Sequence, residues 1–203
     1  MPTPVVSHAL RAAALATSLF ITACASIEAP EGPPRKEVVL AATASGELIR
    51  FNAGQPSRVL SRVAVSGLDS GDRLVGIDFR VARGVLYALS ARGRLYTLDP
   101  ASGKLAAVGA GVALAAGDEA LGFDFNPVAD RIRVVTAAGR NLRLQPDTGA
   151  LAAEDAALRY ADGDTAAGTP ARVGAAAYTY NKNDVKLTTN YAIDVARGTL
   201  LRQ

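Results

Sequence analysis

The sequence predicts an all-β fold, a β-propeller-like tandem repeat of about four four-stranded units with a period of about 46 residues. Three observations support this prediction. Residues 76–107 align without gaps over 122–153, and 12 of these 32 positions are identical. Within each unit apolar residues alternate with a period of two, and glycine-bearing turns separate segments of strand length. Four such strands match the size of a propeller blade, and an irregular β-sandwich is the alternative.

In the first complete unit, turn residues mark where each predicted strand begins and ends. Gly93 lies in a short turn between two apolar segments, where a tight hairpin needs the left-handed backbone that glycine accepts. Turn-forming residues at 99–103 then mark the next corner. The predicted strands are one that ends at Asp78 and Phe79, followed by 85–90, 94–99 and 105–108.

The next unit repeats this pattern one period later. Gly139 stands where the first unit has Gly93, and Pro146 stands where it has Pro100. Aligned proline and glycine turns indicate that both units are built in the same way. The predicted strands are one that ends at Asp124 and Phe125, followed by 131–136, 141–145 and 151–153.

Two weaker copies flank the complete units. Residues 39–52 match 85–99 at a shift of 46 to 47, and a copy that starts at Gly174 contains a longer hairpin. The Ala-rich segments 110–120 and 152–160 leave helices open, although neither has a sustained 3.6-residue period.

We expect the last unit to be incomplete. An open array leaves unpaired edge strands that seek partners. The chain should therefore self-associate or be marginally stable, unless N-terminal strands such as 38–43 complete the final blade.

The N-terminal segment predicts export. An apolar run over 12–22 follows Arg11, is shorter than the about 20 residues that span a bilayer, and is typical of a signal peptide. Residues 21–24 (ITAC) resemble a bacterial lipobox in which Cys24 is acylated; an ordinary signal peptide with an incidental Cys is the alternative. We expect a lipoprotein signal peptide at 1–23, a Pro-rich tether at 24–37 and the repeat domain at 38–203.

The expected location is the outer membrane, with the domain facing the periplasm or the cell surface. By resemblance to lipoprotein sorting in Gram-negative bacteria, the absence of Asp after Cys24 favours this membrane. Removal of 1–23 takes away one Arg and no acidic residue, so the formal net charge falls from +3 to +2. Because no basic cluster remains, we expect no nucleic-acid partner.

The supply of reactive side chains excludes several kinds of chemistry. The chain has one His and one Cys, and both lie in the first 24 residues. The remaining body therefore lacks the residues for Ser-His-Asp hydrolysis, thiol nucleophiles, disulfide frameworks and ordinary Cys/His zinc sites.

Asp78 and Asp124 occupy equivalent positions in the two complete units, each followed by Phe. A functional interpretation gathers them around the propeller axis as metal ligands or acid–base groups. The structural interpretation, which repetition favours, has each Asp cap a turn or accept backbone N–H bonds within its own blade, with Phe79 and Phe125 in the core.

Three further groups are candidates for binding. Asn126, Asp130 and Arg131 form the densest polar group, and only one unit contains it. Asp162 and Asp164 have the alternate spacing of a calcium loop, but an ordinary Asp/Gly turn is the interpretation we favour, so no cofactor is expected apart from calcium there. The strand tyrosines Tyr178, Tyr180 and Tyr191 suggest either a sugar-stacking face or cross-strand packing.

The phrases LVGIDFR (74–80), LGFDFNPVADRIRVV (121–135), NLRLQPDTGAL (141–151) and GAAAYT (174–179) carry a family resemblance. On these residues the sequence resembles a bacterial family catalogued as domain of unknown function 4394, over about 38–203. The resemblance implies an exported, propeller-like repeat protein without an assigned activity and supplies no catalytic residues. Ala166 stands where Asn is expected in the family.

These observations favour a lipid-anchored binding or scaffolding module that contacts a protein or an envelope polymer through its loops. The alternative is a propeller-type hydrolase or lactonase that uses carboxylates and a metal ion. Such sites need converging acids or histidines, which the body supplies poorly, so a binding module is favoured over an enzyme. A truncated gene product without a function is the third possibility.

Overall fold

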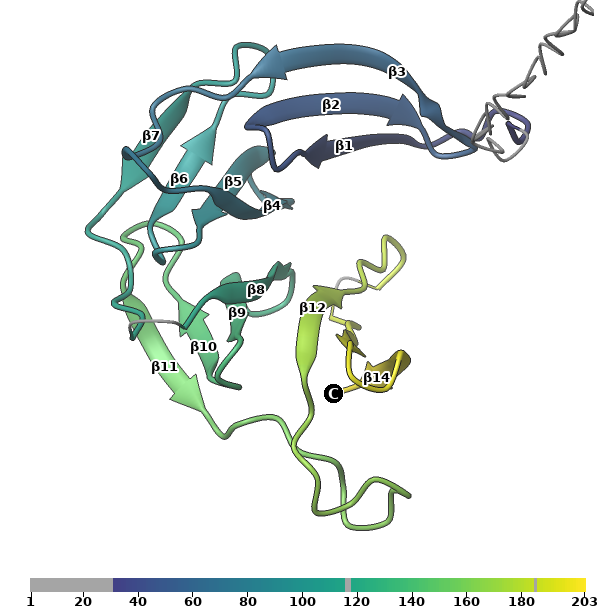
Figure 1. Cartoon of the computed structure of the whole chain (residues 1–203), viewed down its shortest axis with the longest axis vertical. Helices are drawn as coiled ribbons and strands as arrows, with labels where there is room; N and C mark the ends of the chain where they lie inside the picture. The colour runs from purple at the N-terminus through teal and green to yellow at the C-terminus, as the bar shows by residue number, and fades with distance from the viewer. Residues whose placement is uncertain (1–30, 116–117, 185) are drawn as a thin grey trace, which may run out of the picture. The chain divides into compact units, whose positions relative to one another are not determined.

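The computed structural model describes residues 31–115, 118–184 and 186–203, which belong to one compact unit. This unit is all-β, and its strands form four antiparallel sheets that follow one another along the chain (Figure 1). The predicted all-β, propeller-like repeat is confirmed. Helices are absent from the described residues: 151–155 form a strand, and the described part of 110–120 is not helical.

The sheets differ in their number of strands. The second and third sheets have four strands each, as the repeat predicts, whereas the first and fourth have three described strands each. In order, the sheets contain β1 (Val38–Ala42), β2 (Glu47–Asn52) and β3 (Gln55–Ala64); β4 (Leu74–Arg80), β5 (Val85–Ser90), β6 (Leu95–Leu98) and β7 (Leu105–Val108); β8 (Ala120–Asn126), β9 (Arg131–Thr136), β10 (Asn141–Leu144) and β11 (Leu151–Asp155); and β12 (Val173–Tyr178), β13 (Asn190–Asp194) and β14 (Thr199–Arg202).

The hairpins repeat with the sequence period. Gly46, Gly93 and Gly139 have positive φ angles of 78°, 82° and 82°, the left-handed region that glycine accepts without strain. Each donates its backbone N–H to the residue three positions earlier. The β1–β2 hairpin is therefore equivalent to the β5–β6 and β9–β10 hairpins. Accordingly β1 pairs with β2 in the first sheet. The possibility that the strand at 38–43 completes the last blade is therefore not realised among the described residues.

The strands β4, β8 and β12 bring neighbouring sheets together, because β8 packs against both β4 and β12. In each of these three strands, the pairing register with the following strand shifts just after the first paired residue. The shifts lie at 74–76, 120–122 and 173–175. This shared irregularity aligns Asp78 with Asp124, and Phe79 with Phe125 and Tyr178. We call β4, β8 and β12 the inner strands.

The core lies between sheets rather than within them. Tyr87 and Leu89 of the second sheet pack in one cluster with Phe123 and Ile132 of the third. Phe125 is 5% exposed and belongs to this cluster, whereas Phe79 is 40% exposed. The prediction that both Phe side chains are buried is therefore wrong for Phe79, because Phe125 has the second sheet to pack against and its ring lies 5.2 Å from that of Tyr87.

The described part of the predicted tether contacts the first sheet. The backbone N–H of Arg35 donates to the side-chain oxygen of Asn52 at 2.7 Å, and the Gln55 amide donates to the carbonyl of Gly32 at 3.3 Å. The predicted signal peptide and Cys24 lie outside the described residues. In the part of the chain that the structure describes, no helix has the length and apolar character needed to cross a membrane.

Candidate functional site

The inner strands are joined by carboxylates that reach from one sheet to the next. Asp78 accepts a hydrogen bond from the backbone N–H of Phe125 at 2.8 Å. One period later, the Asp124 carboxylate accepts the backbone N–H of Tyr178, the residue equivalent to Phe125. Asp78 also accepts the N–H of Phe79 in its own strand. The prediction of bonds within one blade is thus incomplete, because the second oxygen of Asp78 and the Asp124 carboxylate bind the following sheet.

Two glycines allow this close approach. A Cβ atom on Gly76 would lie 2.6 Å from the Cβ of Phe123, and one on Gly122 would lie 2.8 Å from the Cβ of Ala176. Contacts this short are not tolerated by real side chains, so both positions require glycine for steric reasons. The repeated glycine places each inner strand near enough to the next for the Asp contacts to form.

Asp78 and Asp124 form a carboxyl pair, which we call the inner carboxyl pair. Asp78 lies close enough to Asp124 to affect its ionisation. Burial, followed by the hydrogen bond and charge repulsion from Asp78, raises the pKa of Asp124 to about 8. The inner carboxyl pair therefore holds a proton more readily at neutral pH than two exposed acids would. The structure thus brings together two of the residues that the sequence singled out.

A second group lies beside Asp124 on the same face of the third sheet. Asp124 is paired directly with Arg133, and Arg133 with Arg143, so these three side chains project from one face. Arg133 and Arg143 border a cavity of about 100 Å³. We call it the arginine pocket; its lining residues are Asn126, Ala129, Arg131, Arg133, Arg143 and Tyr178.

Three residues of the arginine pocket are arginines, and one carboxylate forms ion pairs with two of them. Arg133, only 11% exposed, donates to Asp155 at 2.6 Å, and Arg143 donates to the other oxygen of Asp155 at 2.7 Å. These bonds hold the pKa of Asp155 below its usual range. Arg133 also donates through Nε to the hydroxyl of Tyr178 at 3.2 Å. With three guanidinium groups and one paired carboxylate, the arginine pocket has an excess of positive charge.

Arg131 is held differently. Its Nη1 donates to the backbone carbonyl of Asp130 at 2.9 Å, and no carboxylate among the described residues lies within ion-pair distance of it. Asn126 caps the adjoining turn, because its side-chain oxygen accepts the N–H groups of Val128 and Ala129 at 2.9 Å each. The turn therefore positions Arg131 at the pocket without neutralising it.

Asp130, the third member of the polar group predicted from sequence, serves another contact. Its carboxylate accepts Nε of Arg80 at 2.8 Å, while Asp147 accepts Nη1 of Arg80 at 2.5 Å. Arg80 is 3% exposed. The two acids therefore compensate a buried charge between the second and third sheets, and Asp130 is not a pocket residue.

Asp162 and Asp164 each have a separate partner. The Asp162 side chain is 92% exposed and accepts Nη1 of Arg159 at 2.9 Å. Asp164 accepts the backbone N–H of Ala166 at 2.8 Å, as in an ordinary Asx turn. Over residues 31–203, apart from 116–117 and 185, no three His, Cys, Asp or Glu side chains are grouped so that they could hold a metal ion.

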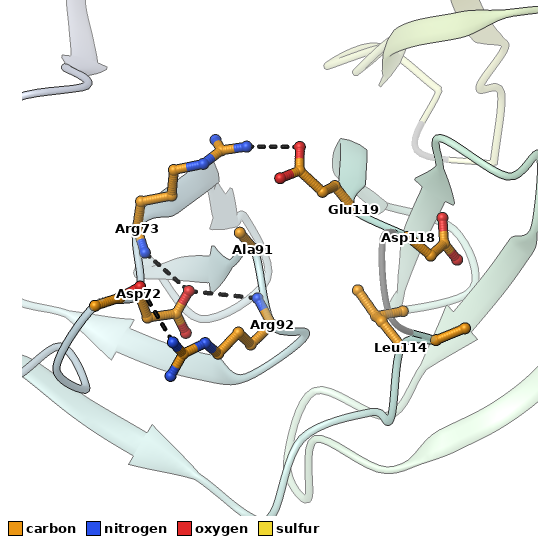
Figure 2. A pocket seen from close by; sticks show the side chains of 9 residues that line it. Asp72, Arg73, Ala91, Arg92, Leu114, Asp118 and Glu119 are labelled. Carbon is orange, nitrogen blue, oxygen red and sulfur yellow. Dashed lines mark hydrogen bonds and ion pairs between the residues drawn. The ribbon is translucent and has the colours of Figure 1, made fainter.

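A larger cavity of about 530 Å³ lies where the β5–β6 hairpin meets the loops before β4 and β8 (Figure 2). Arg73 and Glu119 form an ion pair of 2.7 Å across it. Asp72 accepts the backbone N–H of Arg92 at 3.4 Å, and Asp118, one period later, accepts that of Ala138 at 2.9 Å. These two acids thus support equivalent hairpins of successive blades. Neither acid was among the predicted site residues, although their 46-residue spacing was a detectable signal.

Arg133 and Arg143 were also missed. Arg131 and Arg133 stand two apart in a predicted strand, which places both side chains on one face. That spacing was the available signal. Tyr178, considered for sugar stacking, contributes its hydroxyl to the arginine pocket, whereas Tyr191 pairs across the sheet with Ala177. Tyr180 follows β12 and is 45% exposed.

Several solved structures are similar to this chain at low identity. BBS1N, in a complex with ARL6DN, is 13% identical with a TM-score of 0.43, over 76% of this chain and 41% of that one. The β-propeller domain of Myceliophteria thermophila Cps50 (Swd1) is 12% identical with a TM-score of 0.46, over 80% and 48%. The computationally designed Ika4 protein is 15% identical with a TM-score of 0.41, over 88% and 94%. The chain thus spans less than half the length of the first two.

The sequence of this chain matches a protein-family model over most of its length. No curated protein matches the chain. The model described as "Domain of unknown function (DUF4394)" matches residues 47–203, which is more than half of the chain and includes the inner strands and the arginine pocket. The predicted family resemblance is confirmed, and this chain belongs to the DUF4394 family.

Proposed function

We propose that this protein is a binding module, held at the outer membrane by lipid on Cys24, whose arginine pocket takes a small oxyanion carried by a protein or an envelope polymer. One observation carries the proposal: three guanidinium groups border one concave site, and the single carboxylate of Asp155 pairs with only two of them. Guanidinium groups bind carboxylate, sulfate and phosphate with strong, charge-assisted hydrogen bonds.

The size of the arginine pocket supports a small group as its ligand. Its volume of about 100 Å³ corresponds to roughly three water molecules at their share of liquid volume. This space suits one oxyanion head rather than a whole sugar ring. Arg133 is fixed by Asp155 and Tyr178 before any ligand arrives, which reduces the entropy lost on binding.

A titration with sulfate tests the pocket. Calorimetry on the purified full-length protein in detergent should detect sulfate binding, and Arg131→Gln should weaken it by about tenfold or more, because a charged hydrogen bond contributes about 1.5–3 kcal/mol. Arg159→Gln is the matched control, since Arg159 is 73% exposed and pairs with Asp162 outside the pocket. Equal sulfate affinity in the wild type and Arg131→Gln would contradict the proposal.

The lipid anchor needs its own experiment. The proposal rests on the ITAC segment at 21–24 that ends the apolar run. Palmitate labelling and membrane fractionation should show lipid on the wild type and none on Cys24→Ser. Equal labelling of both proteins, or a mature N-terminus elsewhere, would exclude acylation of Cys24.

Acid–base hydrolysis by the inner carboxyl pair is the second candidate function. The favouring observation is the pKa of about 8 for Asp124, which suits a general acid near neutral pH. Against it, both carboxylates already accept backbone N–H groups from the next inner strand. Lactone hydrolysis that disappears in both Asp78→Asn and Asp124→Asn would support this function; a wild-type rate equal to that of the two variants would rule it out.

A further inference from the structure

We propose that the arginine pocket binds its oxyanion together with a proton held by the inner carboxyl pair, so that anion binding is coupled to proton uptake. This inference rests on the proposed function, because it concerns the regulation of the same pocket. In this proposal Asp78 and Asp124 exchange a proton when the anion binds, and they do not need to contact the anion themselves.

Tyr178 connects the two groups physically. Its backbone N–H donates to the Asp124 carboxylate, and its hydroxyl accepts Nε of Arg133 at 3.2 Å. Tyr178 also lines the arginine pocket. One residue of β12 therefore contacts both the group that exchanges the proton and a guanidinium that would hold the anion.

Strand register provides a second connection. Asp124 of β8 lies directly across from Arg133 of β9, and residues paired in this way project from the same face. If Asp124 loses its proton, its new negative charge lies beside Arg133 and competes with a bound anion for that guanidinium. A protonated Asp124 leaves Arg133 available to the pocket.

The groups around Asp124 set the direction of the coupling. Asp78 faces it from β4 and disfavours a second negative charge, while Arg133 faces it from β9. From β12 it meets the backbone N–H of Tyr178, and β5 contributes Tyr87, whose ring packs on the neighbouring Phe125. Burial and Asp78 thus raise the pKa of Asp124 to about 8, so the inner carboxyl pair takes up a proton more readily than exposed acids do.

Ionisation of Asp124 adds a negative charge on the residue paired with Arg133 and so lowers the positive potential at the arginine pocket. The affinity for an anion should therefore fall as the pH rises through about 8. By linkage, a bound anion should favour the protonated pair and cause net proton uptake on binding. Arginine remains charged throughout this range and does not contribute to the change.

Sulfate is the appropriate probe because it remains a dianion over the whole range. We would titrate the full-length protein with sulfate from about pH 6.5 to about pH 9.5 and expect the Kd to rise by roughly tenfold, as for a coupling of ordinary size. Asp124→Asn mimics the protonated acid and should show a Kd that changes little with pH. Asp162→Asn, at an exposed carboxylate outside the pocket, should behave as the wild type does.

Proton uptake gives a readout that needs no variant. At about pH 8, the binding enthalpy of the wild type should depend on the ionisation enthalpy of the buffer, which reports protons taken up with sulfate. If Asp124→Asn fails to fold, Asp78→Asn and this measurement still decide the question. Absence of sulfate binding at every pH would overturn the proposed function. Binding with a constant Kd and no proton uptake would overturn only the coupling.

Discussion

Arg80 and Asp130, which lie 50 residues apart, form an ion pair that ties the second sheet to the turn between β8 and β9. Two Arg80 nitrogens donate to the two Asp130 oxygens, at 2.8 and 2.5 Å. Asp147 accepts from the same guanidinium, whose side chain is only 4% exposed. A bidentate geometry around a nearly buried charge makes this pair more important for stability than an ordinary surface ion pair.

Asp130→Asn should destabilise the domain. The change leaves the buried Arg80 with one charged partner, and we expect a loss of about 1–2 kcal/mol, or a fall in Tm of roughly 2–8 °C. Asparagine is the suitable replacement because Asp130 has a φ of 48°, a left-handed conformation that Asn accepts. Thermal unfolding followed by circular dichroism measures the effect, with Asp162→Asn as the exposed control. Equal Tm values for the two variants would show that the pair contributes nothing.

The same contact predicts sensitivity to acid. Arg80 lowers the pKa of both Asp130 and Asp147 below their usual values. A lowered pKa in the folded state stabilises the protein above the unfolded value of about 3.9, and this stabilisation is lost as the pH falls through the folded value. We therefore expect Tm to decline below about pH 4, and to decline less in Asp130→Asn. Parallel declines in both proteins would refute this assignment.

Asp124 predicts a pH effect of the opposite sign. Its pKa is raised to about 8, so its contribution to stability is full below the unfolded value and is lost as the pH rises toward 8. Asp124→Asn should abolish this decline and unfold at a higher temperature than the wild type near pH 8, by several degrees. Melting curves between about pH 5 and about pH 9 test it. A variant that is less stable at every pH would mean that the proton is not the relevant feature.

Gly76→Ala tests the approach of the inner strands. The added Cβ would lie 2.6 Å from the Cβ of Phe123, so the second and third sheets must move apart. We expect a loss of about 1–3 kcal/mol, as in other overpacked cores. Gly163→Ala is the control, because a Cβ added there would meet no atom within 4 Å and the φ of Gly163 is not in the left-handed region. Similar stability of both variants would show that the close contact is unimportant.

The candidate site was only partly predictable. Asn126 and Arg131 line the arginine pocket, and Asp78 lies near Asp124, so the structure brings together residues within each of two predicted groups. Asp130 was grouped with Arg131 because the two are adjacent in sequence. In the folded chain the Asp130 carboxylate binds Arg80 of the second sheet. Asp130 has a left-handed backbone conformation at the end of the turn between β8 and β9, and this turn lies beside the second sheet.

Local pattern determined the strands and the order of the repeats. Alternating apolar residues and the turn glycine Gly93 predicted β5 (Val85–Ser90), because a strand's two faces and a tight turn each depend on only a few neighbouring residues. The contacts of Asp124 with Tyr178 and of Arg80 with Asp147 span 54 and 67 residues. Only the tertiary structure decided these contacts, because they depend on how closely adjacent sheets pack at Gly76 and Gly122, a distance that no local spacing encodes.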